Sequence, residues 1–234
     1  MENQKEYIIN NINRVKAEIN EIKEKNNFSE PALLVAVTKT RTVEEINYAL
    51  SSGITDIGEN KVQEILDKYE KVQKARWHMI GHLQTNKVKY IIDKVHMIHS
   101  VDSYKLAEEI NSRASQAGLT MNILIQINPA NEESKFGINP EETIALVERI
   151  KNDFQNIKIK GLMTIAPYSE NPEEVRKYFR SVHEIYNDIL NNYEFGKDFE
   201  YLSMGMSNDF QIAISEGANV VRIGSLIFGD RNYL

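Results

Sequence analysis

Short apolar segments alternate with amphipathic helical segments along most of the chain. Regular alternation of this kind requires parallel strands joined by crossover helices. Eight such units in a chain of 234 residues predict an α/β fold, a single-domain (β/α)₈ barrel of the TIM type; a doubly wound open sheet is the alternative. The predicted strands are 33–39, 54–57, 77–80, 95–99, 123–127, 157–163, 201–203 and 220–223. The predicted helices between and after them are 43–52, 60–74, 85–92, 103–117, 140–152, 172–192 and 208–216, with a short turn at 225–228.

An extra amphipathic helix is predicted over about 5–25, before the first strand. Apolar residues recur there at helical spacing, with charged residues between them. We expect this helix to pack outside the barrel, residues 1–234 to form one domain, and the chain to be a monomer, although the apolar face could also pack on another chain. The apolar positions are Ile8, Ile9, Ile12, Val15, Ile19 and Ile22.

Composition narrows the class of protein. A net charge of −6 argues against nucleic acid as a partner, and the absence of cysteine excludes disulfide and thiolate chemistry. The polar start of the chain lacks the apolar segment of a signal peptide, and no apolar run approaches the roughly 20 residues that span a bilayer. We therefore expect a cytoplasmic protein with no membrane partner.

Lys39 ends the first apolar segment, at the end of a strand where α/β folds place their ligands. A lysine beside a low-dielectric wall can have a lowered pKa, and a neutral amine condenses with aldehydes. The alternative is an ordinary surface lysine in the loop that follows the strand. Residues near the other end of the chain suit a phosphate group, and they favour the ligand-binding interpretation of Lys39.

Serines and glycines follow the seventh and eighth predicted strands, where barrels commonly bind phosphate. Ser203 and Gly205 end the seventh strand, and Ser207 lies where a helix would begin; Gly224 and Ser225 follow the eighth strand. Hydroxyl groups beside free backbone N–H groups hold a dianion without any lysine. Helix capping explains each serine singly, but their joint position favours phosphate.

Arg222 lies within the apolar strand 220–223, where a charge requires a partner. It either forms an ion pair with a carboxylate such as Asp56 or Glu59, or points into the barrel mouth toward a ligand.

Seven short motifs occur in a fixed order over nearly the whole chain: 35–39, 57–64, 77–87, 135–137, 160–163, 202–207 and 221–229. In these motifs the sequence resembles the pyridoxal phosphate homeostasis protein family, which shares its barrel with the amino-terminal domain of alanine racemases. The resemblance implies pyridoxal 5′-phosphate as cofactor, held as an internal aldimine (a Schiff base) on Lys39, with no metal. It implies further that Asn60 flanks the ring and that Arg222 faces the pyridine nitrogen. The phosphate would be held by Ser207, Gly224 and Ser225. The predicted cofactor-binding residues are Lys39, Asn60, Ser203, Met206, Ser207, Arg222, Gly224 and Ser225.

An arginine at the pyridine nitrogen cannot accept its proton, so the ring stabilises a carbanion less well. Alanine racemases add a tyrosine base from a second domain, for which we expect no counterpart because the sequence stops at Leu234. Tyr168 is the nearest substitute, or else a tyrosine of the rim. We therefore expect a protein of intracellular pyridoxal phosphate homeostasis, buffering the cofactor or delivering it to apo-enzymes, without robust turnover.

Three enzyme classes remain as alternatives. A pyridoxal phosphate-dependent amino-acid racemase or lyase would use Lys39 as its base. A Schiff-base aldolase acting on a phosphorylated sugar would usually carry its lysine on a middle strand. A metal hydrolase would need the predicted rim or core histidines, which straddle strand ends without a carboxylate cluster: His78, His82, His96 and His99.

Overall fold

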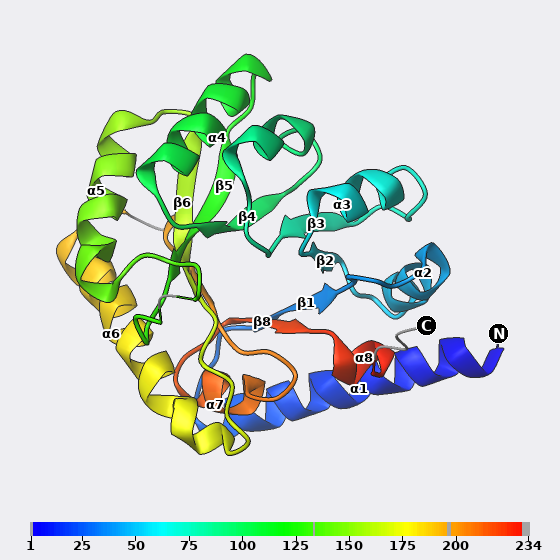
Figure 1. The fold of residues 1–234 in the computed structure, drawn as a ribbon. Helices are drawn as coiled ribbons and strands as arrows, with labels where there is room; N and C mark the ends of the chain where they lie inside the picture. Colours follow the sequence, from blue (N-terminus) through cyan, green and yellow to red (C-terminus); the bar gives the residue numbers. More distant parts are fainter. Residues whose placement is uncertain (1, 133, 196–197, 231–234) are drawn as a thin grey trace.

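The computed structural model describes residues 2–132, 134–195 and 198–230, and within them parallel strands close into a barrel (Figure 1). Neighbouring strands pair in chain order, and the first strand also pairs with the last, Leu34 opposite Val221. The (β/α)₈ barrel is thereby confirmed and the open sheet is wrong. The strands are β1 (Leu33–Val37), β2 (Asp56–Glu59), β3 (Arg76–Met79), β4 (Met97–Val101), β5 (Met121–Ile127), β6 (Ile157–Thr164), β7 (Tyr201–Ser203) and β8 (Val220–Ile223).

Helices surround the barrel, and the long helix α1 lies across one side of it (Figure 1). Helix α1 contacts α2, α7 and α8, so its apolar face is buried on this chain. The α-helices are α1 (Glu2–Lys25), α2 (Val43–Ser51), α3 (Val62–Lys68), α4 (Tyr104–Gln116), α5 (Thr143–Asp153), α6 (Arg176–Asn192), α7 (Phe210–Ser215) and α8 (Ser225–Phe228). The 3₁₀ helices are η1 (Thr85–Tyr90), η2 (Pro140–Glu142) and η3 (Pro172–Val175).

Several predicted boundaries are wrong. The helix predicted over 60–74 is the shorter α3, and the one predicted over 85–92 is the 3₁₀ helix η1. The second and fourth strands begin two residues later than predicted, at Asp56 and Met97, where pairing with the neighbouring strand begins. Ile54 and Val95 precede these strands and are buried without being paired in a named strand. The apolar pattern of a sequence indicates which residues are buried, not which are paired. The predictions for the second and fourth strands therefore began before the paired backbone.

The barrel interior is partly polar. Along each strand, alternate side chains face the helices and the barrel axis. Trp77, Ile98 and Leu202 belong to the large apolar core beneath the helices, so the buried His78, His99 and Ser203 beside them face inward. Barrels of this type usually fill their interior with branched apolar side chains. Here a small apolar cluster inside (Met97, Leu124 and Met163) leaves room for polar groups, which must satisfy one another because they are shielded from water.

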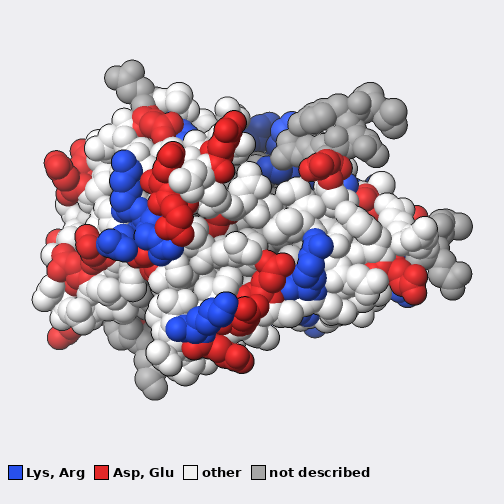
Figure 2. Space-filling view, turned by 90° about the horizontal axis from the view of Figure 1, so that it is seen from below, with Lys and Arg blue, Asp and Glu red and all other residues white. Residues whose placement is uncertain are grey.

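The surface carries both charges. On the face drawn in Figure 2, acidic and basic side chains are interspersed, so this face presents no single-sign patch for a polyanion. Within the described ranges, no helix combines the length and apolarity needed to cross a bilayer.

Ile12→Ala tests how strongly α1 holds the barrel. Ile12 is completely buried, so we expect its truncation to lower the free energy of unfolding by about 2–5 kcal/mol. Asn13→Ala, at the exposed neighbouring position, should change it by no more than about 0.5 kcal/mol. Urea denaturation followed by circular dichroism measures both; equal effects would show that α1 does not depend on this face.

Candidate functional site

A cavity of about 450 Å³ opens at the carboxyl ends of β1, β6, β7 and β8. This volume falls within the range of about 300–1,000 Å³ that small-molecule sites occupy. Apolar side chains of Val37, Ile165 and Ala166 form part of its wall. Six of the predicted site residues line it: Lys39, Met206, Ser207, Arg222, Gly224 and Ser225.

The backbone on both sides of Lys39 is fixed by hydrogen bonds. Lys68 Nζ donates to the carbonyl of Thr38 at 3.0 Å, and the Thr38 hydroxyl donates to Glu59 Oε1 at 2.7 Å. On the other side, the N–H of Thr40 donates to Glu64 Oε2 at 2.6 Å. Thr40 has a φ of 65°, a left-handed conformation that a threonine adopts only when its surroundings hold it there.

Glu59, Glu64 and Lys68 form an ionic cluster behind β1, in which Glu59 is completely buried and Glu64 is partly exposed. Lys68 Nζ lies 2.8 Å from an oxygen of each glutamate. Burial raises the pKa of Glu59, and the hydrogen bond and charge of Lys68 offset part of this rise. Burial has the same sense at Glu64, but the hydrogen bonds from Lys68 and the Thr40 N–H outweigh it and lower the pKa. The cluster therefore needs its one lysine to keep two carboxylates charged.

The loops after β7 and β8 meet at Ser207. Its Oγ accepts hydrogen bonds from the backbone N–H groups of Gly224, at 3.3 Å, and Leu226, at 3.5 Å. A Cβ added at Gly224 would lie 3.4 Å from Val37 Cβ. A hydroxyl and backbone N–H groups thus converge beside the cavity, and such donors suit an anion.

The helix predicted from residue 208 instead begins at Phe210, so Ser207 does not lie at the start of this helix as predicted, and the alternative that Ser207 only caps this helix is wrong. Asp209 precedes the helix and its Oδ1 accepts the Met206 N–H at 2.6 Å, which closes a turn around Ser207. Gly205 begins this turn with a φ of 92°; a Cβ there would lie 2.6 Å from Ala213 Cβ. Ser207 is therefore directed to the neighbouring loop and not to its own helix.

Arg222 is 2% exposed and reaches the cavity wall from inside the barrel. Its Nη1 donates to Ser203 Oγ at 2.7 Å and its Nη2 to the carbonyl of Thr164 at 2.8 Å. Burial lowers the pKa of Arg222 to about 10, an effect that the charge of Asp209 opposes. Asp56 pairs with Arg76, and Glu59 with Lys68, so the alternative that Arg222 forms an ion pair with either acid is wrong.

Two predicted site residues lie outside the cavity. Ser203 is completely buried and adjoins the cavity through Arg222. Asn60 lies in the loop before α3, not at the start of the helix as predicted, and lines a separate hollow with His82. There His82 stacks on Phe136 with ring centroids 3.7 Å apart, so the aromatic ring of the 135–137 motif packs between loops.

Charged residues that the sequence analysis did not assign to the site also line the cavity: Arg41, Lys135 and Asp209. Arg41 Nη2 donates to the carbonyl of Gly229, which ties the loop after β1 to the end of α8. Arg41 lies two residues after Lys39, at the same strand end, and this position could have predicted that it lines the cavity. Tyr168 lines the cavity at the rim and is 78% exposed.

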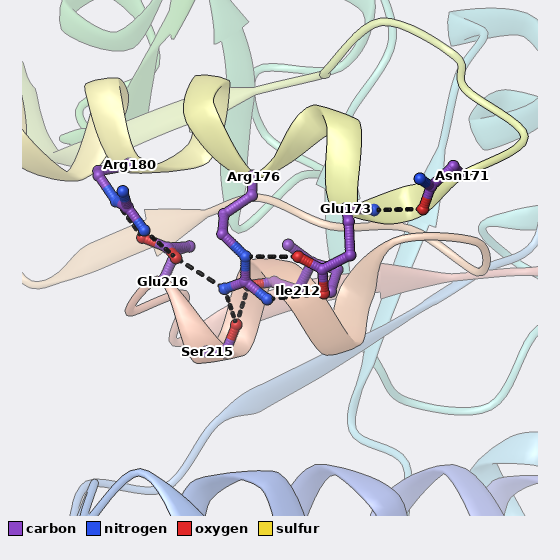
Figure 3. Close-up of polar contacts among 7 residues, drawn as sticks. All are labelled: Asn171, Glu173, Arg176, Arg180, Ile212, Ser215 and Glu216. Carbon is purple, nitrogen blue, oxygen red and sulfur yellow. Dashed lines mark hydrogen bonds and ion pairs between the residues drawn. The ribbon is translucent and has the colours of Figure 1, made fainter.

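One wall of the cavity is anchored by the ion pairs drawn in Figure 3. Pro172 and Val175, the two ends of η3, line the cavity. Arg176, the first residue of α6, donates to Glu173 at 2.7 Å and to Glu216 at 2.7 Å, and so joins η3 to the end of α7. The η3 segment is thereby held in place beside the cavity.

The described residues contain no group of three or more His, Asp or Glu side chains placed to share a metal ion. His78 and His99 contact each other inside the barrel instead. The metal-hydrolase alternative therefore has no support from this part of the chain.

Comparison with known proteins agrees with this geometry. Residues 11–232 match the family model described as the amino-terminal domain of alanine racemase. The pyridoxal phosphate homeostasis protein of Aquifex aeolicus is 46% identical over 204 residues, which are 86% of this chain and 88% of that protein. The chain belongs to the pyridoxal phosphate homeostasis protein family. The human member is 38% identical, over 86% of this chain and 77% of its own.

Solved structures place this member of the pyridoxal phosphate homeostasis protein family among close structural relatives. PipY of Synechococcus elongatus, solved with pyridoxal phosphate bound, has a TM-score of 0.78 and 30% identity, over 90% of this chain and all of that one. A protein of Bifidobacterium adolescentis has a TM-score of 0.89 and 32% identity, over 97% of both chains. Alanine racemase of Clostridium difficile, with a TM-score of 0.74 and 16% identity over 98% of this chain and 60% of its own, shares the fold.

Lys68→Met tests the cluster that holds the turn of Lys39. Removing the lysine leaves Glu59 buried without its cation, so we expect the free energy of unfolding at pH 7 to fall by about 3–5 kcal/mol. The loss should shrink as the pH is lowered from 7 to 5, because the pKa of Glu59 is already raised and the folded variant then takes up a proton more readily than the unfolded chain.

The double variant Lys68→Met/Glu59→Gln is the matched control. It removes the unpaired charge together with the cation, so it should recover much of the lost stability at pH 7 and have a flatter pH dependence. Urea unfolding at several pH values measures all three proteins. A single variant as stable as the parent at every pH would show that the cluster does not depend on Lys68.

Proposed function

We propose that this chain binds pyridoxal 5′-phosphate as a Schiff base on Lys39 and acts in pyridoxal phosphate homeostasis, buffering the cofactor or delivering it to apo-enzymes. The observation that carries the proposal is that one cavity is lined both by the amine-bearing Lys39 and by Ser207, whose hydroxyl contacts the backbone N–H of Gly224. The family's name and the bound cofactor of PipY support the same ligand.

The residues present fit this cofactor. Its phosphate requires hydrogen-bond donors. The Ser207 hydroxyl could donate directly, and the N–H groups of Gly224 and Leu226, which donate to Ser207 Oγ in this structure, lie beside it. Its ring requires an apolar wall, which Val37 and Ile165 contribute. When bound, the cofactor supplies an aldehyde that condenses with a primary amine with loss of water. Two lysines line the cavity and could supply that amine, Lys39 and Lys135.

Arg222 would hold the ring nitrogen. Its pKa of about 10 keeps it protonated at pH 7, and a guanidinium donates hydrogen bonds but accepts none. It would therefore leave the nitrogen unprotonated, which makes the ring a weaker electron sink than an acidic partner would. This favours holding an aldehyde over stabilising a carbanion.

Lys39→Ala tests the covalent attachment. Protein loaded with pyridoxal phosphate should show an absorbance band within about 330–430 nm that survives gel filtration, and this variant should lose it. Lys61→Ala, at an exposed lysine after β2, is the matched control and should keep the band. Borohydride reduction and peptide mapping identify the modified lysine; modification at Lys135 in the parent protein would contradict the assignment.

The racemase or lyase alternative makes a different prediction from the carrier. An enzyme using Lys39 as base would exchange the α-proton of an amino acid with solvent deuterium, and proton NMR detects this exchange. The carrier should produce none above the rate of free cofactor for the common amino acids. Exchange that depends on Lys39 would reject the carrier proposal in favour of an enzyme.

Ser207→Ala tests the phosphate site. Loss of a hydrogen bond to a charged group costs about 1.5–3 kcal/mol, so we expect the affinity for pyridoxal phosphate to fall by about 10-fold or more. Affinity for pyridoxal, which lacks the phosphate, should change less than about 2-fold. Absorbance titration with each ligand measures the difference; equal losses for both would mean that Ser207 does not face the phosphate.

A further inference from the structure

A continuous series of hydrogen bonds crosses the barrel interior from Arg222 to Asp56, and we call it the interior chain. Its members are at most 2% exposed. Its heavy-atom distances are Arg222 Nη1 to Ser203 Oγ 2.7 Å, Ser203 Oγ to His99 Nδ1 3.1 Å, His99 Nε2 to His78 Nδ1 2.9 Å, and His78 Nε2 to Asp56 Oδ1 2.8 Å. Five strands contribute one residue each.

The interior chain joins the two ends of the barrel. Asp56 is the first residue of β2, whereas Ser203 is the last residue of β7 and Arg222 lines the cavity. At the amino end Asp56 also accepts two hydrogen bonds from Arg76, whose side chain is 51% exposed. A carboxylate at one end of the barrel is thus connected, without a gap, to the guanidinium at the other.

The direction of the first hydrogen bond follows from the charge of Asp56. Burial alone would raise its pKa, but hydrogen bonds from His78, Arg76 and Thr55 outweigh burial and hold the pKa of Asp56 well below its ordinary value. An ionised carboxylate only accepts hydrogen bonds. The proton between Asp56 and His78 therefore lies on His78 Nε2.

The direction at the other end follows from Ser203. Its Oγ accepts from Arg222, so its own hydrogen needs an acceptor, and His99 Nδ1 is the partner recorded for it among the described residues. Burial holds the pKa of His99 well below 6.5, and the positive charge of Arg222 acts in the same direction, so the His99 ring is neutral and carries one proton. With Nδ1 accepting, that proton lies on Nε2 and is donated to His78 Nδ1. Every bond of the interior chain then points from Arg222 toward Asp56, and each buried group has a partner of the right kind.

We propose that Asp56 is a positioning residue for Arg222: acting through His78, His99 and Ser203, it sets the direction of the interior chain and so holds the guanidinium in one orientation in the cavity wall. The meeting of Arg222 with a cofactor ring rests on the proposed function. The direction of the chain does not, because it follows from protein groups alone.

Reversal of the interior chain shows why a carboxylate is needed. An amide at position 56 can donate to His78 Nε2, which moves the proton of each imidazole to Nδ1. Ser203 Oγ would then accept from both His99 and Arg222, and its own hydrogen would have no described acceptor. Asp56→Asn should therefore mix the two directions and loosen the guanidinium.

The test is the tautomeric state of the histidines in ¹⁵N-labelled protein freed of cofactor, read from two-bond ¹H–¹⁵N spectra at pH 7. We expect the Nε2–H form at both His78 and His99, with each Nδ1 accepting a hydrogen bond, and Asp56→Asn to shift both toward the Nδ1–H form. His183, on α6, is the internal reference and should not change. Doubly protonated His78, or His99 with its proton on Nδ1, in the parent protein would overturn the proposal.

Ser203→Ala is the second variant, which keeps the proposal testable should Asp56→Asn fail to fold. It removes the link to Arg222 but leaves Asp56 in place, so His78 and His99 should keep their Nε2–H form while the ¹⁵N signals of the Arg222 side chain broaden or shift. Tautomers that change in Ser203→Ala would show that Asp56 does not set the direction.

Loading the same proteins with pyridoxal phosphate separates this proposal from the proposed function. Asp56→Asn should alter the absorbance maximum of the bound cofactor, or the pH at which it changes, with the Schiff base on Lys39 retained. If the parent protein has the Nε2–H form of both histidines but binds no pyridoxal phosphate, the proposed function is wrong and the role of Asp56 stands. If the parent protein binds pyridoxal phosphate but has other tautomers, the role of Asp56 is wrong and the proposed function stands.

Discussion

The polar side chains inside this barrel depend on one buried guanidinium, that of Arg222. Arg222 lies almost entirely out of water, and an ion in that position destabilises the fold unless its donors are satisfied. Ser203 and the Thr164 carbonyl accept two of its hydrogen bonds, and Ser203 in turn needs His99. One cation at the cavity wall thus explains why polar side chains replace part of the usual aliphatic filling.

The cavity contains several groups suited to binding a ligand but few that could act as an acid or a base on it. Lys39 offers an amine, and Ser207 with its neighbouring loop offers donors for an anion. Arg222 stays protonated and only donates, so it cannot serve as an acid–base group near neutral pH. Asp209 lines the same cavity, and burial raises its pKa, which leaves it nearest to a proton-transferring role. Under the proposed function, this balance would favour retention of a reactive aldehyde.

Sequence predicted the barrel and six residues of the cavity, largely because both depend on local patterns. Strand ends are marked by neighbouring residues, so Lys39, Ser207 and Gly224 could be placed at one rim from their order alone. The interior chain could not be predicted, because His99 and Ser203 are 104 residues apart and meet only through the register of the closed barrel. The position of Asn60 beside His82 likewise depends on how two loops pack.

Strand β2 links the two halves of the site. Side chains alternate along it, so Asp56 faces the barrel axis with the interior chain, whereas Glu59 faces the helices and bonds to Lys68 and Thr38. One acid acts toward Arg222 and the other toward the turn of Lys39. Gly58 faces inward between them, where a Cβ would lie 2.9 Å from Ile80 Cδ1. A register slip of one residue would place Asp56 among the helices and Glu59 in the interior, and both groups that line the cavity would lose their support together.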